Sequence, residues 1–119
     1  MTQKQIDESV AYLKKRGFET PEIGIVLGTG LGQLVHMIEN PTVAHYNHIP
    51  YFPLATVEFH SGKLIYGTIE GKKAVVMQGR FHLYEGYDFV DITYPIRVMH
   101  QLGIKKLFVS NVYNYYMVL

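Results

Sequence analysis

Hydrophobic residues near the start of the chain recur at helical spacing. Ile6, Val10 and Leu13 occupy positions i, i+4 and i+7, and this period predicts an amphipathic helix over residues 3–16. Gly17 favours an end to the helix there, because glycine readily adopts the left-handed conformation of a helix C-terminus. The pattern therefore predicts a helix that packs one face against a core.

A second helix is predicted over residues 89–102, where apolar residues again share one face. These residues are Phe89, Ile92, Ile96, Met99 and Leu102. Asp88 is a suitable N-cap, and Gly103 favours an end to the helix. Pro95 lies inside the pattern, so it predicts either a kink or a later start of the helix.

Short apolar runs between and after these helices predict strands. IGIVLG at residues 23–28 is typical of a buried strand that ends in glycine. Residues 64–69 and 73–77 predict two strands joined by a turn at Glu70-Gly71. The run KKLFVSN indicates a last strand that begins at Lys105. Strands with helices between them predict an α/β sheet with helices on its faces.

Two stretches are less regular in their pattern. Residues 31–38 predict a short helix. Residues 39–63 are expected to be irregular, because they contain Pro41, Pro50 and Pro53. At 119 residues, the chain is expected to form one domain.

Composition narrows the classes of function. The chain has 11 basic and 10 acidic residues and a net charge of +1, so no nucleic-acid or membrane partner is expected. It has no cysteine, which excludes disulfides and thiolate metal sites. The polar start MTQKQIDESV has no apolar signal core, and no apolar run approaches the ~18 residues of a spanning helix. These features fit a cytoplasmic protein.

The segment GTGLG, at residues 28–32, is a candidate phosphate site. It follows a strand and precedes a predicted helix, where backbone N–H groups favour an anion. Glycines allow close approach of the backbone, and Thr29 adds a hydroxyl donor. The spacing matches neither the dinucleotide fingerprint nor the Walker A loop. A tight strand-to-helix turn without a ligand would explain the same residues.

A denser group of polar residues lies in QGRFHLYEGY, at residues 78–87. In an extended segment, Arg80, His82 and Tyr84 would point to one side. An arginine fork suits phosphate oxygens, and a histidine adds another donor. Glu85 could orient the imidazole of His82. A surface loop with an arginine–glutamate pair is the alternative, although two anion-friendly segments that both follow strands of one α/β sheet favour a ligand site.

These motifs resemble those of the trimeric purine nucleoside phosphorylases. The resemblance rests on QGRFHLYEGY, GTGLG and the HSG of residues 60–62, and it runs from about residue 20 to residue 111. Shorter stretches that fit the same family are IPYFP at 49–53 and TYPIRVMHQLG at 93–103. The resemblance implies the N-terminal part of a nucleoside phosphorylase-type α/β sheet with flanking helices.

The resemblance also implies an activity and a set of site residues. The family cleaves purine nucleosides and deoxynucleosides with phosphate, which yields the free base and α-ribose-1-phosphate or its deoxy form. It uses no metal or organic cofactor, and it forms homotrimers. The positions that correspond to its phosphate-binding residues are Thr29, His60, Arg80, His82 and the backbone of Val112. Tyr84 corresponds to a residue that contacts the ribose, and Glu85 would orient His82.

The chain departs from the family pattern near its end. The family continues Ser-Asn as Ala-Ala-Gly-Gly, whereas this chain reads SNVYNYYMVL. Residues 1–119 are therefore expected to be a single partial α/β domain, with a phosphorylase-like part over 20–111 and an aberrant tail over 112–119. A frameshift or a truncated reading frame would explain the tail. The family residues that hold the purine lie in a second half that is not found here.

Three functions remain open from the sequence. The first is a phosphorylase, active alone or completed by a second chain. The second is a catalytically inactive truncated fragment that retains only a phosphate-binding half-site. The third is a dinucleotide-binding module, against which the glycine spacing argues. His45 and His48 lie three residues apart without a clear third ligand, so no metal site is expected there.

Overall fold

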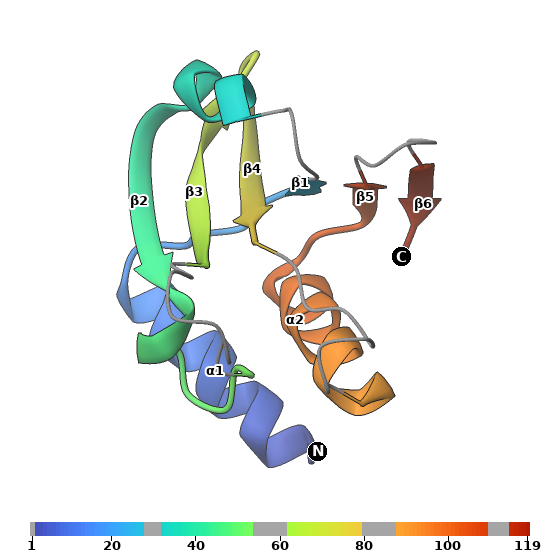
Figure 1. The fold of residues 1–119 in the computed structure, drawn as a ribbon. Helices are drawn as coiled ribbons and strands as arrows, with labels where there is room; N and C mark the ends of the chain where they lie inside the picture. Colours follow the sequence, from blue (N-terminus) through green and yellow to red (C-terminus); the bar gives the residue numbers. More distant parts are fainter. Residues whose placement is uncertain (1, 28–31, 54–61, 80–87, 110–114) are drawn as a thin grey trace.

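A mixed six-stranded sheet organises the computed structural model (Figure 1). The structure describes residues 2–27, 32–53, 62–79, 88–109 and 115–119. The strands are β1 (Ile23–Leu27), β2 (Glu39–His45), β3 (Lys63–Ile69), β4 (Lys72–Gln78), β5 (Lys106–Val109) and β6 (Tyr115–Val118). Their order across the sheet is β2-β3-β4-β1-β5-β6. The prediction of an α/β fold is confirmed.

Strand β1 lies in the interior of the sheet between two parallel neighbours. It pairs with β4 on one side and with β5 on the other. The outer pairs, β2–β3, β3–β4 and β5–β6, are antiparallel. Strands β3 and β4 form the predicted hairpin, and both turn residues have positive φ, 52° at Glu70 and 78° at Gly71. This pair of conformations is that of a tight hairpin turn.

Helix α1 (Gln3–Lys15) confirms the first helical prediction. Thr2 caps it, because the Gln5 amide donates to the Thr2 hydroxyl oxygen at 3.2 Å and the Thr2 amide donates to Gln5 Oε1 at 3.1 Å. Its buried apolar side chains are the predicted Ile6, Val10 and Leu13. Gly17 adopts φ +101° after the last turn, as expected.

Helix α2 (Phe89–Leu102) also lies where it was predicted, and it begins at the Asp88 cap. Pro95 lies inside the helix and does not delay its start. The predicted apolar face is partly wrong, because Phe89 is 71% exposed in the first turn. The buried side chains are Tyr94, Pro95, Val98, Met99 and Leu102. Tyr94 orients this face, since its hydroxyl donates to the Gln5 carbonyl oxygen of α1 at 3.0 Å.

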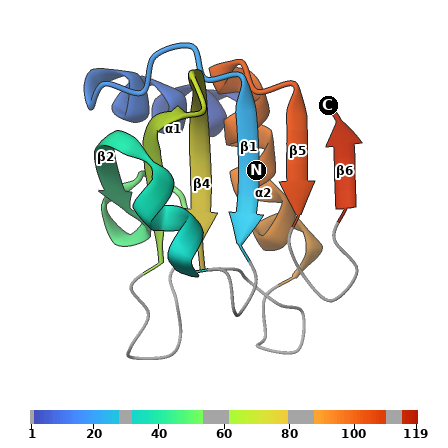
Figure 2. The same ribbon diagram turned by 90° about the horizontal axis from the view of Figure 1, so that it is seen from above.

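The two α-helices cover one face of the sheet (Figures 1 and 2). Their apolar side chains form one core with sheet residues such as Val26, Leu64, Val75 and Leu107. A smaller cluster, of Leu27, Ile38, Ile65 and Val76, packs with side chains of the short 3₁₀ helix η1 (Gly32–Met37). Figure 2 shows η1 on the face opposite the α-helices. The predicted short helix after the glycine segment is thus a 3₁₀ helix.

The expectation that residues 39–63 are irregular is wrong in its first part. Residues 39–45 form β2, which pairs with β3. Pro41 is tolerated because β2 is an edge strand, and the pairing register shifts between Glu39 and Thr42. A second 3₁₀ helix, η2 (Tyr46–His48), follows directly.

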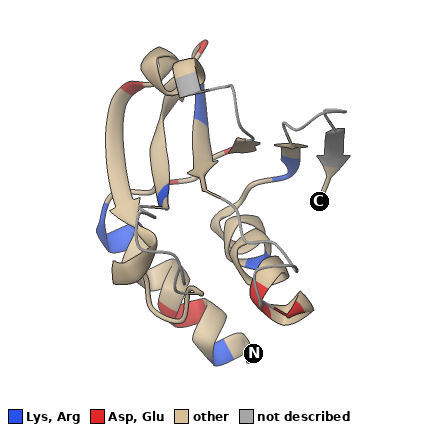
Figure 3. Cartoon of the chain, viewed as in Figure 1, with Lys and Arg blue, Asp and Glu red and all other residues tan. Residues whose placement is uncertain are grey.

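Charged residues are interspersed over the described part of the molecule. Figure 3 shows lysine, arginine, aspartate and glutamate on the helices and on the strand ends, with both signs mixed. Within the described residues, no helix is long and apolar enough to cross a membrane.

Candidate functional site

One edge of the sheet gathers the ends of four strands. The carboxyl ends of the parallel strands β4, β1 and β5 lie side by side, with Leu27 opposite Gln78 and Val26 opposite Val109. The amino end of β3 lies at the same edge, because Lys63 pairs with Gln78. Open α/β sheets bind ligands beyond the carboxyl ends of their parallel strands.

The predicted site residues belong to segments attached to this edge. They are Thr29, His60, Arg80, His82, Tyr84, Glu85 and Val112, and all of them lie outside the described residues. Their described chain neighbours are Leu27 before the first segment, Gly62 after the second, Gly79 before the third and Val109 before the fourth. The fold therefore brings the attachment points of all four segments to one edge of the sheet, as a shared site requires.

Tyr46 connects two of these attachment points. Its hydroxyl donates a hydrogen bond to the Gly79 carbonyl oxygen at 2.6 Å, and its backbone amide donates to the Gly62 carbonyl oxygen at 3.0 Å. Residue 79 directly precedes Arg80, and residue 62 lies two positions after His60. Tyr46 thus holds the end of the chain segment that carries His60 against the start of the segment that carries Arg80.

The two glycines permit a close approach of the backbones at this point. A Cβ atom on Gly79 would lie 3.0 Å from Gly62 Cα, and Gly79 has φ +105°. A Cβ atom on Gly62 would lie 2.2 Å from two carbons of the Tyr46 ring. Real Cβ atoms essentially never come as close as the 2.2 Å found for Gly62, and a Cβ atom on Gly79 would require its neighbour to shift slightly. The positive φ of Gly79 also favours glycine. Side chains at either position would separate the two segments.

Tyr46 itself is fixed by the core. It is only 3% exposed, and its ring lies 5.6 Å from that of Phe52, which in turn lies 5.8 Å from the ring of Tyr94. Burial raises the pKa of the Tyr46 hydroxyl far above its ordinary value. The hydroxyl therefore stays protonated and can donate to Gly79 throughout the neutral range.

A buried acceptor also lies at the same edge. Gln78 Oε1 is buried and accepts no hydrogen bond from any residue in the described part of the chain. A buried carbonyl oxygen without a donor is costly. Its position at the end of β4 makes it an acceptor for a hydroxyl group or a water molecule at this edge.

Sequence reasoning missed Tyr46. It lies in the stretch that was expected to be irregular, so no periodic pattern marked it as a core residue. The glycines of HSG and QGR were a usable signal, because Gly62 lies two positions after His60 and Gly79 directly precedes Arg80. Two glycines at strand ends indicate a close backbone contact, and such a contact requires a neighbour to maintain it.

His45, the last residue of β2, and His48, in η2, lie close to each other. The rings of His45 and His48 lie 5.9 Å apart at an interplanar angle of 79°. Over the same described residues, no group of three metal-ligating side chains occurs. A zinc or similar site needs at least three protein ligands, and the expectation that no metal binds at this pair stays a prediction.

Known proteins share this arrangement. The family described as the Phosphorylase superfamily matches residues 22–112. "Purine nucleoside phosphorylase 1" of Bacillus subtilis is 49% identical over 107 residues, which are 90% of this chain and 40% of that protein.

Two solved structures extend the comparison. A purine nucleoside phosphorylase in complex with ribose-1-phosphate is 47% identical with a TM-score of 0.85, and the match covers 91% of this chain and 40% of that one. The Schistosoma mansoni purine nucleoside phosphorylase in complex with inosine is 44% identical with a TM-score of 0.85 over 92% of this chain and 38% of that one. The chain thus spans about 40% of the length of the relatives that it matches. The match to residues 22–112, together with the common sheet, shows that the chain belongs to the phosphorylase superfamily.

Proposed function

We propose that this chain provides the phosphate- and ribose-binding part of a purine nucleoside phosphorylase. The reaction would convert a purine ribonucleoside or deoxyribonucleoside and phosphate into the free base and α-(deoxy)ribose-1-phosphate. The observation that carries the proposal is the convergence of four strand ends, each next to a segment with a predicted substrate-binding residue. Inosine and ribose-1-phosphate in the matched structures support this class of substrate.

The proposed roles follow the chemistry of the residues. Arg80, His82 and Thr29 would hold phosphate beneath the sugar, with His60 and the backbone N–H of Val112 as further contacts. Tyr84 would contact the ribose, and Glu85 would orient the imidazole of His82. Inorganic phosphate is the second substrate, and the proposed chemistry uses no metal or organic cofactor.

The held phosphate would act as the nucleophile. One of its oxygens forms a bond to C1′ while the glycosidic bond to the purine breaks and its electron pair leaves with the base. Positive charge develops on the sugar as this bond lengthens. A phosphate fixed in line stabilises that charge and avoids the entropic cost of a bimolecular encounter. The base takes up a proton and departs as the neutral purine.

A catalytically inactive fragment with only a phosphate-binding half-site is the second candidate. The observation that favours it is that the chain spans about 40% of the length of its relatives. In this alternative, residues 20–111 form the phosphorylase-like part and still bind phosphate, but purine release does not occur.

One pair of measurements separates the candidates. Hypoxanthine release from inosine is followed with and without phosphate, and phosphate binding is measured by calorimetry on the same purified chain. Phosphate-dependent release supports the enzyme, and binding without release supports the half-site. If folded protein shows no phosphate binding and no hypoxanthine release, both proposals are contradicted.

Two further family properties are proposed with this function. We expect a homotrimer, which light scattering after size-exclusion chromatography measures directly. A monomer at all concentrations would contradict this expectation. Residence in the cytoplasm also stays a prediction, and cell fractionation tests it.

A further inference from the structure

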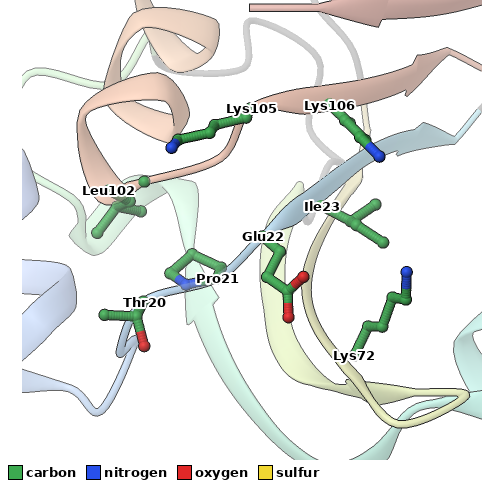
Figure 4. A pocket seen from close by; sticks show the side chains of 9 residues that line it. Thr20, Pro21, Glu22, Ile23, Lys72, Leu102, Lys105 and Lys106 are labelled. Carbon is green, nitrogen blue, oxygen red and sulfur yellow. The ribbon is translucent and has the colours of Figure 1, made fainter.

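A pocket lies at the other end of the parallel strands from the candidate site. It has a volume of about 430 Å³, which is within the range of small-molecule sites. Its walls come from the amino ends of the parallel strands, namely Glu22 and Ile23 at β1, Lys72 at β4 and Lys106 at β5. The C-terminal end of α2 closes one side with Leu102 and Gly103 (Figure 4). No residue of this pocket belongs to the proposed phosphorylase site.

Positive charge predominates in the pocket. Lys72, Lys105 and Lys106 line it together with a single carboxylate, that of Glu22. Three positive charges and one negative charge leave a net charge of +2. In the described part of the chain, none of these four side chains makes a hydrogen bond or an ion pair with another residue.

Two of the lysines point into the same space. Figure 4 shows the ammonium groups of Lys72 and Lys106 directed into the space beside Ile23, whereas Lys105 extends towards Leu102. The strand register agrees, because Ile23 pairs with Lys106 on one side and with Ala74, two residues from Lys72, on the other. Nearby like charges repel one another, so an anion between the two ammonium groups would be stabilised.

The rest of the wall is mostly apolar, with Thr20 as the one polar uncharged residue of the lining. Ile23 is partly exposed beside Lys72 and Lys106, whereas Pro21 and Leu102 are already buried. A ligand that fills the pocket therefore needs an apolar body as well as a negative group. Pockets of this kind bury the apolar body and use a few polar groups to orient the ligand.

Three backbone amides of the pocket lining already donate hydrogen bonds within the protein. The Glu22 amide donates to the Lys73 carbonyl oxygen at 2.9 Å, and the Lys105 amide donates to the Glu22 carbonyl oxygen at 3.2 Å. The Gly103 amide donates to the His100 carbonyl oxygen at 3.0 Å. An anion would therefore be held by the lysine ammonium groups, which recognise charge more than they recognise a planar shape.

We propose that this pocket is a binding site for an organic phosphate monoester. Such a group carries about −1.5 to −2 charges at pH 7, which matches the net charge of the pocket. The phosphate lies between Lys72 and Lys106, and the organic body lies against Ile23, whose side chain is on the same face of the sheet. This site is separate from the phosphorylase site and does not depend on the proposed function.

Phenyl phosphate is a suitable probe, with phenol and inorganic phosphate as controls. Amide chemical shifts of the ¹⁵N-labelled chain are followed by NMR during titration. We expect saturable shifts at Ile23, Lys72, Gly103 and Lys106 with phenyl phosphate, and at least tenfold weaker binding of phenol and of inorganic phosphate at these amides. An Arg80→Ala variant, altered at the opposite edge, should bind phenyl phosphate in the pocket as the unmodified chain does.

A matched pair of double variants tests the lysines. The double variant Lys72→Ala/Lys106→Ala should bind phenyl phosphate in the pocket about tenfold more weakly. This is the combined effect expected from the loss of two exposed ionic contacts. Lys73→Ala with Lys14→Ala makes the same change in net charge outside the pocket lining and should change the affinity less than twofold. The proposal is overturned if the pocket amides do not shift, or if both double variants weaken binding equally.

Discussion

The Tyr46 hydroxyl donates a hydrogen bond of 2.6 Å to the carbonyl oxygen of Gly79. This contact joins the first residue of η2 to the last described residue before Arg80, across 33 positions of sequence. The buried ring behind it is supported by Phe52, so the donor has a fixed position. The contact determines where the chain leaves β4 towards the motif QGRFHLYEGY.

Removal of this hydroxyl should affect the site more than the fold. Tyr46→Phe keeps the buried ring and removes the donor to Gly79, so we expect a loss of about 1 kcal/mol in the free energy of unfolding. We also expect weaker phosphate binding, because Arg80 follows Gly79 directly. Denaturant unfolding and phosphate calorimetry measure the two effects.

Tyr66→Phe is the matched control for this variant. The Tyr66 hydroxyl donates to the Glu19 carbonyl oxygen, also at 2.6 Å, away from the strand ends of the candidate site. The Tyr66→Phe variant should lose less stability, because its hydrogen bond is exposed and water can replace the donor, and its phosphate affinity should equal that of the unmodified chain. Equal phosphate affinities in the two variants would show that the Tyr46 hydroxyl does not position the site.

Gly62 should tolerate no side chain. Gly62→Ala places a methyl group 2.2 Å from the buried Tyr46 ring, and we expect a loss of about 3 kcal/mol from overpacking. Gly71→Ala is the comparison, because Gly71 has φ +78° but nothing within 4 Å of an added Cβ. Backbone strain alone should cost that variant about 1–2 kcal/mol. The urea concentrations at the midpoints of unfolding measure the loss of stability in both variants. A smaller loss in Gly62→Ala than in Gly71→Ala would contradict the contact geometry.

The protein should lose stability at high pH in a way that depends on Tyr46. Burial raises the pKa of this hydroxyl in the folded state above its ordinary value of 10.0. The unfolded state therefore releases the proton first, so this stabilising contribution is complete below pH 10 and declines as the pH rises above it. One such group changes the free energy of unfolding by about 1.4 kcal/mol per pH unit.

Tyr46→Phe isolates that contribution. The free energy of unfolding of the variant should fall less steeply above pH 10 than that of the unmodified chain. Tyr94, whose pKa is also raised by burial, is present in both proteins and cancels in the comparison. Parallel curves for the two proteins above pH 10 would mean that Tyr46 ionises as an ordinary tyrosine does.

The proposed phosphate ligands should differ in strength. Arg80→Ala removes a charged, two-pronged donor and should weaken phosphate binding by about 1.5–3 kcal/mol. Thr29→Ala removes a neutral hydroxyl donor and should cost about 1 kcal/mol. Thr29→Ser retains the donor and should restore most of that loss. Phosphate calorimetry ranks the three variants, and unchanged affinity in the two alanine variants would contradict the assignment.

Local pattern was sufficient to predict most of the elements. Ile6, Val10 and Leu13 set the helical period, and Asp88 and Gly103 marked the two ends of α2. Pattern failed where tertiary contacts decide the outcome. Phe89 fits the apolar stripe of α2, but the helix is rotated so that Tyr94 faces α1 instead.

The strand at Glu39–His45 was missed for a related reason. Pro41 argues against a strand locally, but it is acceptable on an edge strand, and sequence alone does not reveal which strand lies at the edge. The last strand was also missed. No strand was predicted over residues 112–119, and Tyr115–Val118 pairs with β5 as β6. That residues 112–119 are an aberrant tail of a single partial domain stays a prediction.

The sequence predicted which residues form the candidate site, and the roles of these residues stay predictions. Thr29, Arg80 and His82 were selected because their side chains can donate hydrogen bonds to phosphate, which the residue types alone indicate. The sheet adds what spacing did not provide, namely that the segments before β3 and after β1, β4 and β5 attach to one edge. Tyr46 escaped prediction because its role depends on a contact with Gly79 that is 33 residues distant.

The interior position of β1 has a consequence for synthesis of the chain. β1 leaves the ribosome before both of its partners, because β4 and β5 follow it in sequence and their paired residues begin at Ala74 and Lys106. Its apolar residues therefore have no strand partner until about fifty more residues have been made. During that interval the nascent chain presents an unpaired hydrophobic strand, which is a substrate for chaperones and a point at which slow translation favours misassembly.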